Sequence, residues 1–266
     1  SGQLDVLNRC ITAQDVNEFH CENCKFERVM QAIVTANHIN FIHNCHFDYL
    51  KDNCIYNLTS NSGVTPGRLI VTDCYFANRN SEGIVTSGKE NIIKNNIFEN
   101  IPNSAISINN SMDTLIVEGN IFKNLVNDDS TETGTVIKDR SSSTHTIGDF
   151  IFSNNVVDVS SKPAQTGTGN ILYVGTVTSA QMCNNNIKYQ SITSGRAIEF
   201  YGLTNGNLSD NIITDTRNDA TVRVFQWTNA PETLVCKNNL CGNQRITTLR
   251  DYSYTTEWVQ TNTGGY

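Results

Sequence analysis

Acidic, aromatic and basic residues in the second half of the chain are of the types needed for chemistry on a sugar. Two carboxylates can cleave a glycosidic bond when one protonates the leaving oxygen and the other activates water or attacks directly. The candidates are Glu199, with Asp139 or Asp215 as its partner. Aromatic faces stack against sugar rings, and a guanidinium orients hydroxyls or an anionic group. The candidate substrate-binding residues are Tyr201, Arg223, Phe225 and Trp227.

These candidates lie within a repeat that spans nearly the whole chain. Nine times a residue that is polar, or once glycine, is followed by Asn or Cys and then by two mostly apolar residues, as in Asn95-Asn96-Ile97-Phe98. Successive copies lie 21 to 35 residues apart. An irregular repeat of a few tens of residues predicts a solenoid. We take the second positions to be Cys24, Cys45, Cys74, Asn96, Asn120, Asn155, Asn186, Asn211 and Asn239.

Each copy is preceded by two short runs rich in Ile, Val and Phe, and its apolar pair begins a third. Such runs, separated by Asn, Gly, Asp and Ser, predict β-strands, and no stretch keeps a helical period. The repeat therefore predicts an all-β, parallel β-helix of about nine coils with three short strands each. Asn tolerates a left-handed turn, and its amide can bond the Asn one coil away. We expect an asparagine and cysteine ladder along one corner.

Alternation along the first strand of each coil places the candidate residues. We take the equivalent inward residues to be Ile33, Ile55, Ile84, Ile106, Val136, Ile171, Ile198 and Val222. Two outward columns follow, because successive side chains of a strand point to opposite faces. The nearer column is Val34, Tyr56, Val85, Ser107, Ile137, Leu172, Glu199 and Arg223. The farther is Ala36, Leu58, Ser87, Asn109, Asp139, Val174, Tyr201 and Phe225, with Trp227 two places beyond the last.

The second carboxylate has more than one candidate. Asp139 and Glu199 lie two coils apart, so their backbones are separated by roughly 10 Å along the axis. That is near or beyond the upper end of the separation in inverting enzymes, about 6.5–9.5 Å between carboxyls. Asp215, expected in the loop after the third strand of the coil of Glu199, is the alternative. An acid from a neighbouring subunit is an equal one.

A structural explanation exists for the same residues. Glu199 and Arg223, on adjacent coils in one predicted column, could simply neutralise each other as an ion pair. Tyr201 over Phe225 would likewise be ordinary ring stacking. His145 lies near the Ser/Thr-rich stretch 141–144, and its role is left open.

The ladder pattern resembles the right-handed, single-stranded parallel β-helix of the pectate-lyase superfamily, whose asparagine ladder lies between its second and third sheets. The resemblance covers roughly residues 18–245, and it implies that the first sheet forms the binding groove. Residues 1–17 then form a lead-in or cap, and residues 246–266 a second cap or partner-contacting segment. The Arg-x-Pro-x-x-Arg run of pectate lyases and the Asn-Thr-Asp, Gly-His-Gly and Arg-Ile-Lys runs of polygalacturonases are missing.

Cysteine and charge narrow the class of protein. Three of the nine cysteines occupy the ladder slot, which is typical of thiols left reduced after folding in a reducing cytoplasm. Cys21-x-x-Cys24 offers metal-ligand types, but the repeat already accounts for Cys24 and Cys45. We therefore expect no metal and no cofactor. A net charge of −7 without a basic stripe argues against nucleic acid, and no apolar stretch predicts membrane insertion.

Within this superfamily, the ladder and the reduced cysteines make the chain most similar to a bacteriophage tailspike or tail appendage. It implies a receptor-binding protein of the virion tail, folded in the host cytoplasm, that binds and hydrolyses a bacterial surface polysaccharide (capsule, O-antigen or wall glycan). Outward apolar residues favour a homotrimer: Val34, Val85, Ile137, Leu172 and Val174. The alternatives are a non-catalytic glycan-binding adhesin of the same fold, and a polysaccharide lyase or epimerase.

Overall fold

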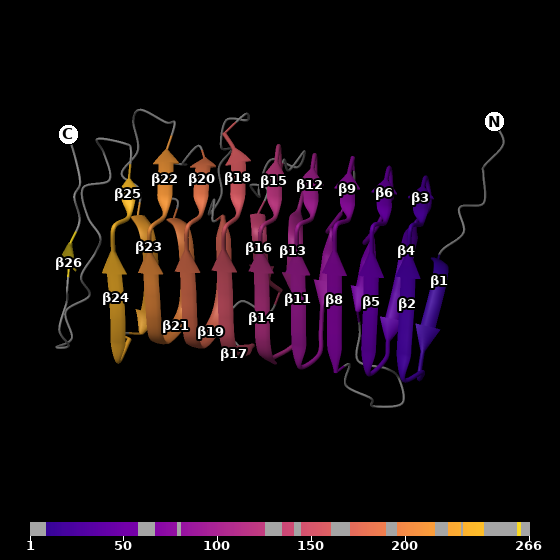
Figure 1. Ribbon diagram of the computed structural model, residues 1–266, viewed down its shortest axis with the longest axis horizontal. Helices are drawn as coiled ribbons and strands as arrows, with labels where there is room; N and C mark the ends of the chain where they lie inside the picture. Colours follow the sequence, from indigo (N-terminus) through magenta and orange to yellow (C-terminus); the bar gives the residue numbers. More distant parts are fainter. Residues whose placement is uncertain are drawn as a thin grey trace.

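Parallel strands stacked coil upon coil make up the described part of the chain (Figure 1). The computed structural model describes residues 9–57, 67–78, 81–125, 135–140, 145–160, 171–189, 196–215, 223–229, 231–241 and 260–261. Within these residues every regular element is a strand, and every pair of strands is parallel. The predicted all-β parallel solenoid is therefore confirmed.

The strands form three faces along the axis. The first contains β1 (Arg9–Gln14), β4 (Gln31–Ala36), β7 (Ile55–Asn57), β10 (Ile84–Thr86), β13 (Ser104–Ile108), β16 (Thr135–Asp139) and β23 (Arg223–Asn229). The second contains β2 (Glu18–Glu22), β5 (Ile39–His43), β8 (Arg68–Thr72), β11 (Glu90–Lys94), β14 (Met112–Glu118), β17 (Thr146–Ser153) and β24 (Thr233–Lys237). The third contains β3 (Lys25–Glu27), β6 (His46–Asp48), β9 (Tyr75–Ala77), β12 (Ile97–Glu99), β15 (Ile121–Lys123), β18 (Val156–Val159), β20 (Asn186–Tyr189), β22 (Ile212–Asp215) and β25 (Leu240–Cys241).

The coils are less uniform than the sequence predicted. About seven turns have three separate strands, against the nine expected. In two others a single long strand, β19 (Leu172–Cys183) or β21 (Arg196–Ser209), runs through the positions of the first and second strands. β1 falls within the segment predicted as a lead-in and pairs with β4, while β26 (Gln260–Thr261) pairs with β24.

Buried amides form the predicted ladder at the corner between the second and third faces. The side-chain oxygen of Asn120 accepts the backbone N–H of Asn96 at 2.9 Å and its side-chain amide at 3.0 Å. The Asn120 amide in turn donates to the carbonyl of Ile93 at 2.9 Å. Each ladder residue thus satisfies the polar groups of the turn one coil below, which burial would otherwise leave without partners. The same pattern recurs at Asn155, Asn185, Asn211 and Asn239.

The residue before each ladder position has a left-handed backbone, with φ near +57° at Asn95 and Asn184 and +68° at Gly119. Asn, Asp and Gly adopt this conformation at the lowest cost, which explains the polar first residue of the repeated phrase. The sequence analysis assigned the left-handed geometry to the ladder residue itself. The structure places it one residue earlier and leaves the ladder residue free to face the interior.

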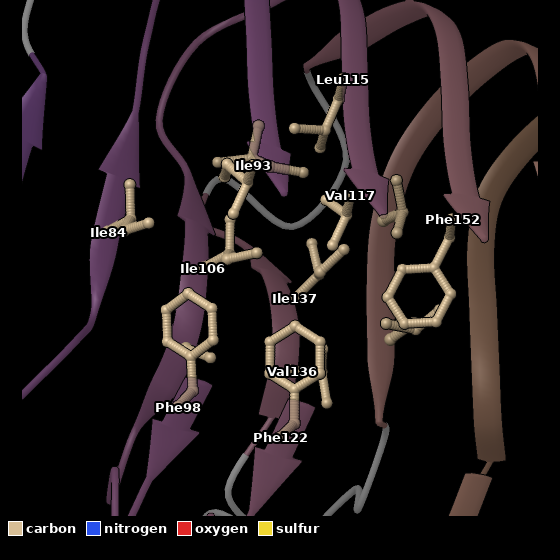
Figure 2. Packing of buried hydrophobic residues seen from close by; sticks show 14 of the residues in the cluster. Ile84, Ile93, Phe98, Ile106, Leu115, Val117, Phe122, Val136, Ile137 and Phe152 are labelled. Carbon is tan, nitrogen blue, oxygen red and sulfur yellow. The ribbon is translucent and has the colours of Figure 1, made fainter. Parts of the chain in front are cut away.

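Phenylalanine rings stack inside the solenoid behind the third face. Phe26, Phe47, Phe76, Phe98 and Phe122 lie one above the next, with ring centroids 4.7 to 5.1 Å apart and interplanar angles of 5 to 10°. Figure 2 shows Phe98 and Phe122 beside the aliphatic side chains of the first and second faces. The rings repeat at the spacing of the strands, so one well-packed coil dictates the packing of the next.

Strand pairing corrects the predicted register in the second half of the chain. Ile106 pairs with Ile137, Leu172 with Ile198, and Ile198 with Phe225. The equivalent residues were predicted to be Val136, Ile171 and Val222, which lie one, one and three places too early. The ladder contains the same kind of error: Asn185 occupies the slot, whereas Asn186 is exposed on β20.

The ladder makes a testable distinction between these two neighbours. Asn185 accepts from the backbone and side-chain amides of Asn155 at 3.0 and 3.1 Å and donates to Phe152 and Asn211 at 2.8 Å each. Asn185→Ala leaves several buried groups unpaired and should lower the free energy of unfolding by about 2–4 kcal/mol. Asn186→Ala should change it by less than about 0.5 kcal/mol. Urea denaturation followed by circular dichroism measures both, and equal effects would contradict the ladder assignment.

Candidate functional site

The outer surface of the first face was predicted to carry the site, and strand pairing now defines its central column. Ser107 pairs with Lys138, Lys138 with Tyr173, and Tyr173 with Glu199. The sequence analysis placed Ile137 and Leu172 at the two middle positions; both are instead fully buried in the core. The corrected column is Val34, Tyr56, Val85, Ser107, Lys138, Tyr173, Glu199 and Gln226.

Glu199 keeps its predicted outward position, on β21. Its side chain lies one coil from Tyr173 in the same column, and only 6 % of the residue is exposed. Tyr201, two residues on, also points outward and is 38 % exposed. A shielded acidic side chain that shares a face with two tyrosines is a suitable arrangement for contacting a sugar.

Phe225 and Trp227 do not lie on this surface. They pair with Ile198 and Phe200, and all four side chains belong to the hydrophobic core. Phe225 is 2 % and Trp227 3 % exposed. The prediction of an outward placement was wrong for both residues, because the register was taken three places too early.

Arg223 and Asp215 are placed by their backbones alone. Arg223 begins β23 and pairs with Arg196, so it does not oppose Glu199, which pairs with Gln226. The predicted ion pair between neighbours in one column therefore has no basis in the register. Asp215 is the last residue of β22 and pairs with Tyr189, on the third face rather than in a loop. Both side chains lie outside the described residues, and their predicted roles stay predictions.

Asp139 faces the interior and was wrongly placed in an outward column. It pairs with the core residue Ile108, and its side chain has no exposed surface. Asp139 Oδ1 lies 2.7 Å from Nδ1 of His145, whose role the sequence had left open. A Cβ atom on Gly175 would stand 2.3 Å from Asp139 Oδ2, so that glycine provides the room for the carboxylate.

A second acidic group on the first face was missed by the sequence analysis. Glu82, just before β10, receives Arg140 Nε at 3.1 Å and Nη2 at 2.9 Å, and Ser107 Oγ donates to it at 2.7 Å. The Glu82 side chain is 5 % exposed and that of Arg140 36 %. No sequence signal links residues 58 positions apart, and both lie outside the alternating strand positions that were considered.

Described side chains that could hold a metal gather at the amino-terminal end. The sulfur atoms of Cys21, Cys24 and Cys45 all lie within 4.8 Å of one another. Hydrogen bonds from the thiols of Cys21 and Cys74 lower the pKa of Cys45, and the same contacts raise the pKa of Cys21 and Cys74.

Known proteins offer no further guide to the site. Comparisons of the chain with protein-family models, with curated proteins and with solved structures found no match. In the described part of the chain no helix is long and apolar enough to cross a membrane. The chemistry of the first face is therefore argued from its own geometry.

Comparing the buried Glu82–Arg140 pair with the surface pair Lys94–Glu118 tests whether the buried pair stabilises the first face. Arg140→Met leaves the buried carboxylate of Glu82 without its main partner, and we expect a loss of about 1–3 kcal/mol in the free energy of unfolding, less than for a fully buried pair because Arg140 is partly exposed. Lys94→Met removes a surface partner of Glu118, where both side chains are more than one-third exposed, and should cost under about 1 kcal/mol. Thermal or urea unfolding compares the two, and a Lys94 effect equal to that of Arg140 would contradict the burial argument.

Proposed function

We propose that the chain is a phage tailspike-type receptor-binding protein that binds and hydrolyses a bacterial surface polysaccharide. The observation that carries the proposal is the outer surface of the first face, where Glu199 adjoins Tyr173 and precedes the exposed Tyr201 on a rigid stack of strands. Near Glu199 the accessible side chains of this face are Lys138, Tyr173 and Tyr201, on three successive coils, and such stacked positions suit a polymer of repeating sugars.

In this proposal Glu199 is the general acid, and Tyr173 and Tyr201 supply ring faces to neighbouring sugars. A carboxylic acid held beside the glycosidic oxygen can protonate the leaving group. The second carboxylate is Asp215 or an acid of a neighbouring subunit, because Asp139 lies inside the corner and is engaged by His145. Arg140, partly exposed beside Glu82, is placed to orient an anionic or acetylated sugar.

The state of the cysteines supports folding in a reducing host cytoplasm before assembly into a virion tail. The eight cysteines among the described residues are free thiols, and six of them are buried. Secreted enzymes acting on polysaccharides would be expected to pair such residues as disulfides.

A non-catalytic glycan-binding adhesin is the second candidate, favoured by a specific observation. Glu82, the other acid of the first face, is buried, its charge is paired with Arg140, and Ser107 donates a hydrogen bond to it. A surface on which one acid is paired and the other is shielded would bind a neutral glycan without cleaving it.

Assembly as a homotrimer is part of the proposal, but on surfaces other than those predicted. Val34 and Val85 are fully buried within this one chain, and Val174 belongs to the core. Half-buried aliphatic and aromatic side chains instead form a continuous outward stripe on the second face: Phe41, Ile70, Ile92, Ile116 and Ile151.

The surroundings of this second-face stripe favour other copies of the same chain as its occupants. Ion pairs flank the stripe on both sides, for example Arg68 with Glu90 on one side and Lys94 with Glu118 on the other. Their charges are already balanced, so a copy of the same surface meets no net repulsion there. A trimer of parallel rods would bury the stripe along its length.

Replacing Glu199 tests the catalytic half of the proposal. Glu199→Gln keeps the shape but cannot donate a proton, so cleavage of a purified surface polysaccharide should fall by about 10²–10⁴-fold while binding persists. Reducing-end assays measure hydrolysis, and ultraviolet absorbance of an unsaturated product would indicate a lyase instead. Glu118→Gln on the second face is the matched control and should retain full activity. Binding by the parent chain without any product would establish the adhesin, and unchanged turnover in Glu199→Gln would remove this residue from the mechanism.

Charging the second-face stripe tests the trimer. The double change Ile92→Glu and Ile116→Glu places carboxylates where apolar surfaces are proposed to meet, and sedimentation should show conversion from trimer to monomer with an unchanged circular dichroism spectrum. Gln181→Glu, at an exposed and already polar position of the same column, should leave the trimer intact. A parent chain that sediments as a monomer would refute the assembly.

A further inference from the structure

Three thiols converge where the first coil meets the second. Cys21 lies on β2 with its side chain in the core, Cys24 lies half-buried at the following turn, and Cys45 lies at the equivalent turn one coil on. The Cys21 and Cys45 sulfurs are 3.8 Å apart, and all three sulfurs lie within 4.8 Å of one another. This arrangement is not a disulfide, because the sulfurs are about 1.8 Å farther apart than a bonded pair.

The sulfur spacing matches what a metal ion requires. A metal–thiolate bond of about 2.3 Å places two sulfurs about 3.8 Å apart around a tetrahedral ion and about 4.0 Å apart around a trigonal one. Closing the widest gap in the cluster therefore requires a contraction of less than about 1 Å. Cys24 is the half-exposed member, so movement of its side chain can supply most of that contraction.

We propose that Cys21, Cys24 and Cys45 bind one soft metal ion, Cu(I) or Zn(II), through three thiolate sulfurs. Binding replaces three S–H bonds by three metal–sulfur bonds and releases the protons to water, with no change in oxidation state. Thiolates select these two ions over harder cations. Among the described residues, the possible ligand atoms that gather here are the three sulfurs, so the site is built of sulfur.

The ladder by itself does not account for this cluster. Cys24 and Cys45 occupy ladder slots, but Cys21 lies in the neighbouring column, where Ile42 and Val71 follow it on the next two coils. Cys21 places a thiol in this aliphatic column directly against the two ladder thiols, and so supplies the third ligand. Because Cys45 belongs to the second coil, a bound ion links the terminal coil to the body of the solenoid.

Metal titration of the reduced chain tests the site. Cys10 is exposed, so a Cys10→Ser background removes a thiol that would bind ions on its own. Cu(I) under anaerobic conditions and Zn(II), each added against a chromogenic chelator, should load one ion per chain, confirmed by native mass spectrometry. The affinities measured in the Cu(I) and Zn(II) titrations show which ion the site prefers. The triple change Cys21→Ser, Cys24→Ser and Cys45→Ser should weaken binding by more than the roughly 10–100-fold that altering supporting residues costs.

Matched variants keep the test decisive. Cys236→Ser changes a buried thiol in the same column as Cys21 at the opposite end of the solenoid, and it should bind the ion as the background chain does. Cys24→Ser alone removes the most exposed ligand and serves if the triple variant does not fold. Hydrogen exchange gives a second readout, since the ion should slow exchange in β2, β3 and β5 only when the three thiols are present. The proposal would be overturned if the Cys10→Ser chain bound neither ion, or if the triple variant and Cys24→Ser bound the ion as tightly as that chain.

Discussion

The hydrogen bonds at one corner of the solenoid set the position of everything else. Each buried ladder amide accepts the backbone N–H of the ladder residue one coil below. It also donates to the carbonyl three residues before that lower ladder residue, as Asn120 does with Asn96 and Ile93. An unpaired buried polar group costs about 1–3 kcal/mol, so a coil shifted by one residue would lose several such contributions at once. Because each coil contacts only its neighbours, this corner transmits the register along the whole axis, and the outer surfaces depend on it.

The sequence predicted the corner well because the corner requires particular residue types. At this corner every left-handed residue is Asn, Asp or Gly, and the next is Asn or Cys, which faces inward; that pair recurs visibly in the sequence. The strands carry less information. Val136 and Ile137 are both fully buried, so hydrophobicity does not say which of them pairs with Ile106. Where Asn184, Asn185 and Asn186 follow one another, residue type cannot identify the ladder position either.

These small register errors had large consequences for the candidate site. A slip by an odd number of residues moves every side chain of a strand to the other face. That is why Phe225 and Trp227 were expected on the surface and lie in the core. Glu199 and Tyr201 were placed correctly because Ile198 of β21 was predicted to face inward, and it belongs to the core. Contacts such as Glu82 with Arg140 were out of reach for a different reason: they join side chains from separate coils at the ends of strands, where alternation gives no guidance.

The cysteine end of the ladder shows what the amides contribute and what the thiols lack. Cys74 reproduces the asparagine pattern, accepting the backbone N–H of Cys45 at 3.3 Å and donating towards the carbonyl of Ile42 at 3.8 Å. Asn96 makes the equivalent contacts to Cys74 and Val71 at 2.9 and 3.0 Å. A thiol is a weaker donor and acceptor than an amide and has one hydrogen to give where the amide has two. The ladder is therefore weakest in the first described coils, where its slots hold cysteine. At the opposite end Cys236 occupies the column of Cys21, but the adjoining slot holds Asn239, whose amide donates to the Cys236 sulfur at 3.3 Å. The two ends thus share a thiol in the same column and differ in the ladder residue beside it. Among the described side chains, the combination at the amino-terminal end is the one that brings three sulfurs within 4.8 Å of one another.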